Sequence, residues 1–202
     1  TKALQETLRA LEGPRCAGVG LAPSGLAAVS TALLAVLKAG DHLMVCDNVY
    51  SPTRSFCDGM LARYCVEVTY FDPLIGVGIE SLFKSNTRAV LLEAPGSQSF
   101  EMPDLPVIAA VAHRHDALVI DDNTWATPLY HRSLELGVDI SIQAATKYIG
   151  GHSDIMFGTL PPNPEAWPSV MPIGVPFACS AFAAMSRSSS VSGKLSMPAA
   201  WN

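Results

Sequence analysis

The sequence predicts an α/β fold in which a mostly parallel sheet is covered by helices on both faces. Short, almost entirely apolar runs alternate along the chain with helix-like stretches, which is typical of parallel strands buried on both faces. Hydrophobic residues make up 49% of the 202 residues and charged residues only 15%, so the chain can bury a substantial core. The runs that we expect to form strands are 43–46, 65–71, 89–92, 117–120, 140–144 and 155–160.

Helices are predicted from the spacing of apolar residues and from the residues that end helices. Residues 1–12 carry three leucines at spacings of four and three, and the Gly-Pro pair that follows ends this helix. A second, largely buried helix runs over 26–38, between Ser24-Gly25 and a closing glycine. The other helix-like stretches are 52–63, 79–84, 103–115 and 133–136.

The α/β pattern ends after Leu160, where six prolines fall within residues 161–176. The charge changes near the same point, since every acidic residue precedes the last thirty-two residues, 171–202, which carry only two basic side chains. We therefore expect one incomplete domain over 1–168. The remaining residues, 169–202, are predicted to be a tail without a recognisable pattern, either disordered or the product of a frameshift.

Charge and cysteine content narrow the class of protein. The net charge of −5 argues against a nucleic-acid binder, which needs a basic face. No apolar run approaches the ~20 residues of a membrane-spanning helix, so no membrane partner is expected. The five cysteines are an odd number without C-x-x-C spacing, which favours reduced thiols in a cytoplasmic protein. The five histidines lack the spacing of a metal site, so no metal is expected.

A turn of small residues, 18–25, precedes the second helix and is a candidate phosphate loop. It fails the dinucleotide template, because Pro23 stands where a glycine is needed, and it fails the Walker A template, because Leu26 follows Gly25. What remains is a helix N-terminus, whose free N–H groups and dipole suit a phosphate. The alternative is an ordinary N-cap.

Three further side chains follow predicted strands, and ligands bind at the carboxyl ends of strands in open α/β sheets. Asp122 ends one strand and can pair with a cationic ring nitrogen or simply cap the strand. Lys147 follows another strand and can act as an amine nucleophile or remain a solvated surface charge. Tyr50 follows a third and can stack on a planar ligand or lie in a surface turn.

A phosphate cradle, a strand-end acid, a stacking aromatic ring and a nucleophilic lysine are together what pyridoxal phosphate requires. The chain also resembles the fold type I, pyridoxal-phosphate-dependent enzymes of the Cys/Met metabolism (transsulfuration) family. The resemblance covers residues 1–168 and implies the large-domain fold of that family. The segments that carry it, in the family's order, are 23–28, 71–76, 92–97, 120–126, 141–148 and 151–154.

The resemblance implies a role for each candidate residue. Lys147 would bind the cofactor covalently and then move protons as acid and base. Asp122 would pair with the pyridinium nitrogen and keep it protonated. Tyr50 would stack on the ring and help to deprotonate the incoming amine.

The resemblance also implies how the phosphate would be held. The backbone N–H groups of Gly25 and Leu26 would bind it together with the Thr146 hydroxyl.

The reaction implied by the resemblance is a carbon–sulfur β-lyase reaction that cleaves cystathionine, a sulfur amino acid, to homocysteine, pyruvate and ammonia in methionine biosynthesis. Many relatives carry Asn-Pro after a Glu-Ser/Thr-Pro turn, where this chain has Pro-Gly-Ser-Gln at 95–98, and many carry serine at the position of Ala144. Both differences favour the β-lyase branch. A γ-synthase or γ-lyase and a catalytically silent remnant remain the alternatives. Family members form homotetramers and are longer, so we expect the N-terminal arm and the C-terminal domain to be absent and activity to be weak.

Overall fold

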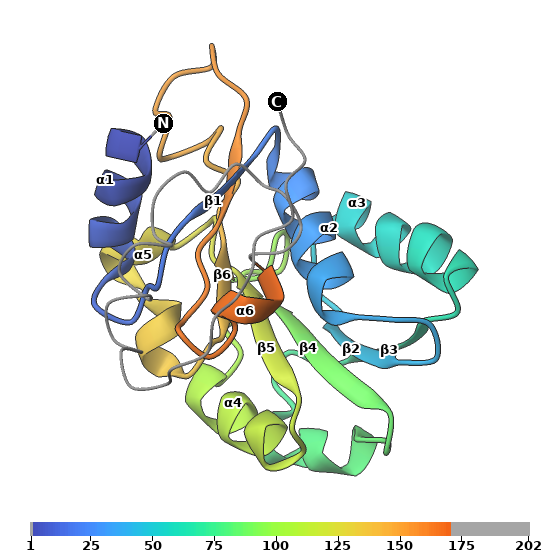
Figure 1. Ribbon diagram of the computed structural model, residues 1–202. Helices are drawn as coiled ribbons and strands as arrows, with labels where there is room; N and C mark the ends of the chain where they lie inside the picture. Colours follow the sequence, from blue (N-terminus) through green and yellow to red (C-terminus); the bar gives the residue numbers. More distant parts are fainter. Residues whose placement is uncertain (1, 171–202) are drawn as a thin grey trace, which may run out of the picture.

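The computed structural model describes residues 2–170, and its centre is a sheet of five parallel strands in the order β3-β2-β4-β5-β6 (Figure 1). The α/β class and the parallel sheet are therefore confirmed. The chain adds β3 on one side of β2 and then crosses back to add β4 on the other, which makes the switch point where α/β sheets bind ligands. The strands are β2 (His42–Cys46), β3 (Glu67–Phe71), β4 (Thr87–Glu93), β5 (Leu118–Asp122) and β6 (Ile140–Ile142).

Two further strands form an antiparallel pair, β1 (Gly20–Ala22) with β7 (Gly158–Leu160). Gln143 and Thr159 exchange two backbone hydrogen bonds of 3.0 and 2.9 Å, which join β7 to the end of β6. The expectation of a strand over 155–160 was thus too long, because Ile155 and Met156 are exposed and belong to the loop that precedes β7.

The helices follow the predicted positions, with three departures in geometry. The stretch 52–63 is a short α-helix continued by a π-helix. The stretches 79–84 and 133–136 fall on 3₁₀-helices rather than α-helices. The division of the chain at residue 168 stays a prediction, and residues 171–202 lie outside the described part. The helices are α1 (Lys2–Glu12), α2 (Gly25–Val36), α3 (Ser51–Ser55), η1 (Phe56–Leu61), η2 (Gly76–Leu82), α4 (Leu105–Arg114), α5 (Thr127–Tyr130), η3 (Ser133–Leu136) and α6 (Trp167–Val170).

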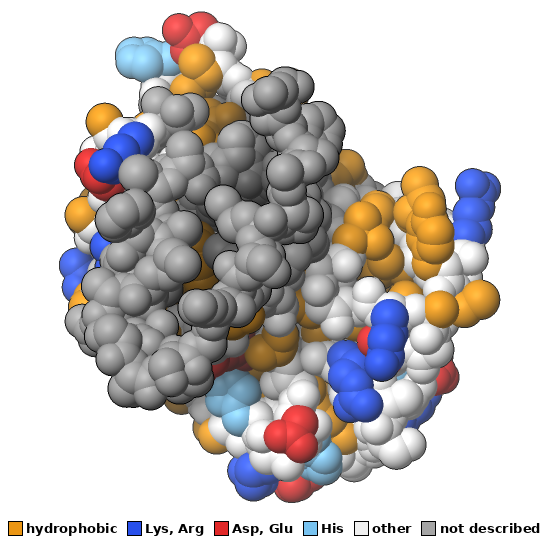
Figure 2. Space-filling model, viewed as in Figure 1, with side chains coloured by type: hydrophobic (Ala, Val, Ile, Leu, Met, Phe, Trp, Pro, Cys, Tyr) orange, Lys and Arg blue, Asp and Glu red, His pale blue; other side chains and the backbone are white. Residues whose placement is uncertain are grey.

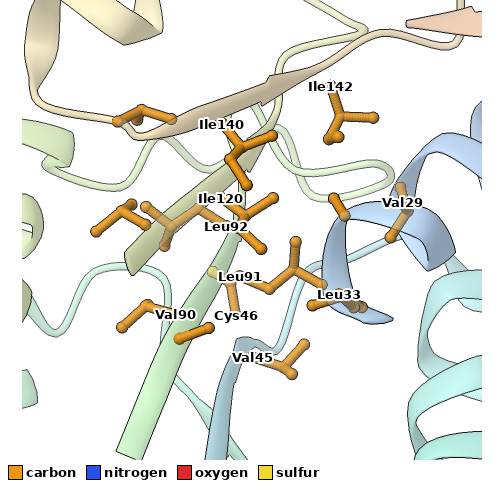
Figure 3. Packing of buried hydrophobic residues seen from close by; sticks show 14 of the residues in the cluster. Val29, Leu33, Val45, Cys46, Val90, Leu91, Leu92, Ile120, Ile140 and Ile142 are labelled. Carbon is orange, nitrogen blue, oxygen red and sulfur yellow. The ribbon is translucent and has the colours of Figure 1, made fainter. Parts of the chain in front are cut away.

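One part of the core lies between α2 and the sheet, and another between α4 and the sheet. Val29 and Leu33 of α2 are buried and extend toward strand side chains such as Leu91 and Ile142 (Figure 3). Fully burying a side chain of this kind stabilises the fold by about 1.5–3 kcal/mol. The face of α2 that bears Val29 also borders the cavity described below, so the same packing fixes the start of this helix.

The opposite face of the sheet is covered by α4, which packs against β5 and η2, and the end of α1 reaches this face as well. Neighbouring residues of a strand point to opposite faces, so Asp121 points away from the face that Asp122 shares with α2. Ser141, paired in register with Asp121, donates a 3.5 Å hydrogen bond to Glu12 at the end of α1. Helices therefore lie on both faces, as predicted.

The surface shows both apolar and charged areas. On the face seen in Figure 2, hydrophobic side chains gather over α2 and α3, and Leu34 of α2 is among the exposed large side chains. None of the helices within residues 2–170 has the length and apolar character that a membrane crossing requires. The four described cysteines are free thiols.

Candidate cofactor site

All six residues that the sequence singled out line one cavity of about 260 Å³. The cavity lies at the carboxyl edge of the sheet, because β2, β4, β5 and β6 run parallel and end at the same edge. The N-terminus of α2 forms its other side. The predicted residues that meet there are Gly25, Leu26, Tyr50, Asp122, Thr146 and Lys147.

The start of α2 is both an N-cap and an open cradle. The Ser24 side chain accepts a 3.1 Å hydrogen bond from the Ala27 N–H and caps the helix. A Cβ atom at Gly25 would lie 2.5 Å from the Cβ of Ala144, so only glycine leaves the helix this close to the turn after β6. The first N–H groups of a helix have no partner within it, and they attract anions. This turn can therefore be an ordinary N-cap and a phosphate-binding site at the same time.

The Asp122 carboxylate is held by Thr124. Its Oδ1 accepts hydrogen bonds from the Thr124 N–H at 3.1 Å and from the Thr124 hydroxyl at 2.5 Å. The same hydroxyl oxygen accepts the Ala144 N–H at 2.7 Å, which ties the ends of β5 and β6 together. Burial raises the pKa of Asp122, whereas the Thr124 hydrogen bonds and the nearby Lys147 ammonium oppose this shift.

Lys147 and Tyr50 face each other across the cavity. The Lys147 Nζ lies 5.6 Å from the centre of the Tyr50 ring. Lys147 is held in a turn, in which its N–H donates to the Ala144 carbonyl at 2.9 Å. Tyr50 remains 44% exposed, so one face of its ring is available for stacking.

These groups fit pyridoxal phosphate. The glycine cradle at a helix N-terminus suits the phosphate, the buried carboxylate suits a pyridinium nitrogen, and the lysine suits the aldehyde carbon. The family model "Cys/Met metabolism PLP-dependent enzyme" matches residues 1–174. The chain belongs to this family. Its cofactor is accordingly pyridoxal phosphate, as the sequence analysis predicted.

Individual family members support the assignment. A Rhizobium johnstonii protein, provisionally named a cystathionine beta-lyase, is 60% identical over 167 residues, which are 83% of this chain and 42% of that protein. Cystathionine beta-lyase of Escherichia coli is 43% identical over 166 residues, with 81% and 42% covered. The structure of cystathionine gamma-lyase from Lactobacillus plantarum in complex with L-serine has a TM-score of 0.79 and 32% identity, with 83% and 43% covered. The chain thus spans about two fifths of the length of these relatives.

The reaction differs among the matched family members. An L-methionine gamma-lyase and an L-alanine/L-glutamate racemase are also among them. Membership of the family therefore fixes the cofactor and the fold, and the reaction depends on the details of the site.

The hydroxyl of Thr146, predicted to hold the phosphate, is engaged elsewhere in this structure. It donates to the Phe157 carbonyl at 3.0 Å and accepts the Phe157 N–H at 3.1 Å. The Thr146 N–H also donates to that carbonyl at 3.0 Å. The hydroxyl proton can consequently turn to a phosphate without leaving the Phe157 carbonyl unpaired, and the phosphate role of Thr146 stays a prediction.

Glu93 and Thr124 were not predicted from the sequence as site residues. Both line the cavity, and Glu93 is only 7% exposed. Burial, followed by the neighbouring Asp122, raises the pKa of Glu93 to about 8. A signal was available, because Glu93 ends an apolar run in the same way as Asp122 ends the next one.

Proposed function

We propose that this chain is the cofactor-binding part of a carbon–sulfur β-lyase that cleaves cystathionine to homocysteine, pyruvate and ammonia. The observation that carries the proposal is the cavity in which Lys147, Tyr50 and Asp122 meet. The most similar relatives reported above share the cystathionine beta-lyase name, which supports the same reaction here.

The turn after β4 favours the β-lyase over the γ-replacing branch. A Cβ atom at Gly96 would lie 2.1 Å from the Asn48 Nδ2, so this turn packs too closely against Asn48 to admit a side chain. Ser97 extends the contact, since its N–H donates to the Asn48 carbonyl at 3.1 Å. The Gly-Ser pair that distinguishes the sequence from the γ-synthases thus has a structural role beside the site.

The chemistry follows from the positions of the side chains. Bound pyridoxal phosphate supplies an electron sink for the bonds at Cα of an amino acid. Tyr50 would take a proton from the substrate amine, and the Lys147 amine would remove the Cα proton. The Cβ–S bond then breaks with its electron pair on sulfur, and Lys147 would return the proton to the thiolate. The remaining three-carbon unit takes up water and gives pyruvate and ammonia.

The substrate carboxylate needs a partner that the described cavity does not contain. Among the residues that line it, Lys147 is the one basic side chain, and arginine is absent from this lining. We therefore expect the 202-residue chain to bind the cofactor and to turn over cystathionine slowly or not at all. The alternative is a catalytically silent chain that binds pyridoxal phosphate alone.

A cofactor titration followed by product analysis tests the proposal. The chain should develop a visible absorption band with pyridoxal phosphate, and Lys147→Ala should lose it. Lys38→Ala is the matched control, because Lys38 is exposed and lies outside the cavity. No band in the unaltered chain would contradict the cofactor assignment.

The products separate the candidate reactions. Cystathionine should give homocysteine and pyruvate if the β-lyase proposal holds, whereas a γ-lyase would give cysteine and 2-oxobutyrate. Band formation without either set of products would support the silent alternative. Rapid pyruvate release would contradict our expectation of slow turnover.

A further inference from the structure

Glu93 is a buried carboxyl group of the cavity to which the proposed reaction gives no task. It is the last residue of β4 and pairs in register with Asp122, the last residue of β5. Paired residues of adjacent parallel strands point to the same face of the sheet, and both line the cavity. The structure therefore places two carboxyl groups side by side next to Lys147.

Glu93 fixes the turn that carries Tyr50. Its Oε2 accepts the Tyr50 backbone N–H at 2.7 Å, while the Tyr50 carbonyl accepts N–H groups of Thr53 and Arg54 in α3 at 2.9 and 3.1 Å. The Tyr50 backbone is thus held on one side by β4 and on the other by α3. Because Tyr50 has no side-chain capping bond of its own, the position of its ring over Lys147 depends on these contacts.

The groups around the Glu93 carboxyl set its charge. The titratable groups that act on it are Asp122 beside it and Lys147 after β6. Asp121, on the other face of β5, interacts with it through charge, and the Cys46 thiol at the end of β2 is hydrogen-bonded to the Glu93 backbone. Lys147 is the cation among these, and it faces two carboxyl groups. Adjacent buried carboxylates cannot both ionise without a large penalty, and the burial that raises the pKa of Glu93 to about 8 favours its protonated form.

We propose that Glu93 is a positioning residue of the cofactor site: its carboxyl group fixes the turn that holds the Tyr50 ring over Lys147, and it keeps a proton so that the negative charge of the carboxyl pair lies on Asp122. This rests on the proposed function only in taking Lys147 and Asp122 as cofactor residues. A carboxylate at Asp122 is the form that suits a pyridinium nitrogen.

The statement that Glu93 keeps a proton is the charge half of the proposal. It is tested on the cofactor-free chain. Glu93→Gln keeps an acceptor oxygen for the Tyr50 N–H but cannot ionise. Since the folded-state pKa is raised, the stability contributed by the proton on Glu93 is complete below the unfolded value of about 4.3 and is lost as the pH rises toward 8. The ratio of the folding constant of the unaltered chain to that of Glu93→Gln should fall by up to about tenfold per pH unit in this interval.

The matched control for this arm is Glu101→Gln. Glu101 lies in the loop after β4 and lines a different cavity, so its substitution controls for the loss of one carboxyl group outside the cofactor site. Urea unfolding at several pH values provides the measurement. If the ratio of the folding constants of the unaltered chain and Glu93→Gln stays the same from pH 5 to pH 8, the charge half of the proposal is wrong.

The positioning half is tested by cofactor affinity from the visible titration. Glu93→Gln should bind within about threefold of the unaltered chain, and Glu93→Leu, which cannot accept the Tyr50 N–H, about tenfold more weakly. If Glu93 acts through Tyr50, the double variant Tyr50→Ala/Glu93→Leu should bind no more weakly than Tyr50→Ala alone. Additive losses, or an unchanged affinity of Glu93→Leu, would overturn this half.

The experiments distinguish a variant that fails to fold, and a proposed function that is wrong, from a failure of the Glu93 proposal itself. Where Glu93→Leu does not fold, Glu93→Asp takes its place, because the shorter side chain keeps the carboxyl group but withdraws the acceptor from the Tyr50 N–H. A chain that binds the cofactor but gives cysteine and 2-oxobutyrate from cystathionine contradicts the proposed function alone. A chain that takes up no cofactor contradicts both that function and the positioning half, and the pH comparison then decides the charge half by itself.

Discussion

Buried polar groups have different surroundings at the two edges of the central sheet. At the amino edge, His42 contributes both ring nitrogens to hydrogen bonds of 2.8 Å with Thr87 and Thr69. Asp139, which precedes β6, accepts the Val119 N–H at 2.7 Å and is bound by further donors. At the carboxyl edge, by contrast, burial and the neighbouring Asp122 raise the pKa of Glu93.

We expect the difference to separate a network that stabilises the fold from one that binds the cofactor. Buried polar groups that find partners contribute to stability, whereas like charges held together cost stability and are typical of binding and catalytic sites. The amino edge should accordingly be sensitive to mutation in its folding, and the carboxyl edge in its cofactor binding. The following substitutions are ordered by the size of the expected effect on stability.

Asp139→Ala should have the largest effect. It removes the acceptor of the Val119 N–H, of the Asn163 side-chain amide at 2.8 Å and of His113 at 2.9 Å. Leaving buried donors unpaired should lower the free energy of unfolding by about 3 kcal/mol or more, measured by urea denaturation. Asp139→Asn, which keeps an acceptor oxygen, should lose about half as much; equal losses would argue against the network.

Gly25→Ala should destabilise by about 1–3 kcal/mol, because its Cβ would overlap the Ala144 Cβ at 2.5 Å. The same methyl group narrows the cradle, so cofactor affinity should fall as well. Gly59→Ala is the matched control, since a Cβ there meets nothing within 4 Å. Comparable unfolding midpoints for the two variants would show that α2 can move away from the turn after β6.

Asp122→Asn should act in the opposite direction on stability. Removing a buried carboxylate beside Glu93 should raise the free energy of unfolding of the cofactor-free chain by about 1 kcal/mol, with a larger gain above pH 8, where Glu93 ionises. Cofactor affinity should fall about tenfold or more. Loss of both stability and affinity would instead give Asp122 a structural role like that of Asp139.

His42 should make the chain sensitive to acid. Burial, followed by the Lys84 charge, lowers the pKa of His42. The neutral ring is therefore favoured by folding, and its contribution is lost as the pH falls below the unfolded value of about 6.5. Between pH 7.5 and 5.5 we expect a loss of about 1 kcal/mol that His42→Gln does not show. Parallel pH profiles for the two proteins would count against this explanation.

The position of a side chain could be predicted from the sequence where it depends only on the end of one strand. Asp122 and Lys147 each follow an apolar run, and parallel strands must end at one edge, so their meeting was predictable. The direction of β7 was not, because apolar content does not encode whether a strand pairs parallel or antiparallel. The role of Glu93 was also hidden, since it depends on a hydrogen bond to the backbone of Tyr50 and on the register of β4 with β5.

The antiparallel pairing of β1 with β7 determines when the site can be completed during translation. β1 leads directly into the start of α2, where a Cβ at Gly158 of β7 would lie 2.3 Å from the Ser24 carbonyl oxygen. The segment before α2 leaves the ribosome early, but the strand that closes on it is among the last described parts to be synthesised. During translation the N-terminus of α2, where we predict the phosphate to bind, should therefore stay uncovered on one side until Gly158–Leu160 has left the ribosome. A chain interrupted before β7 would retain Lys147 and still lack a finished site.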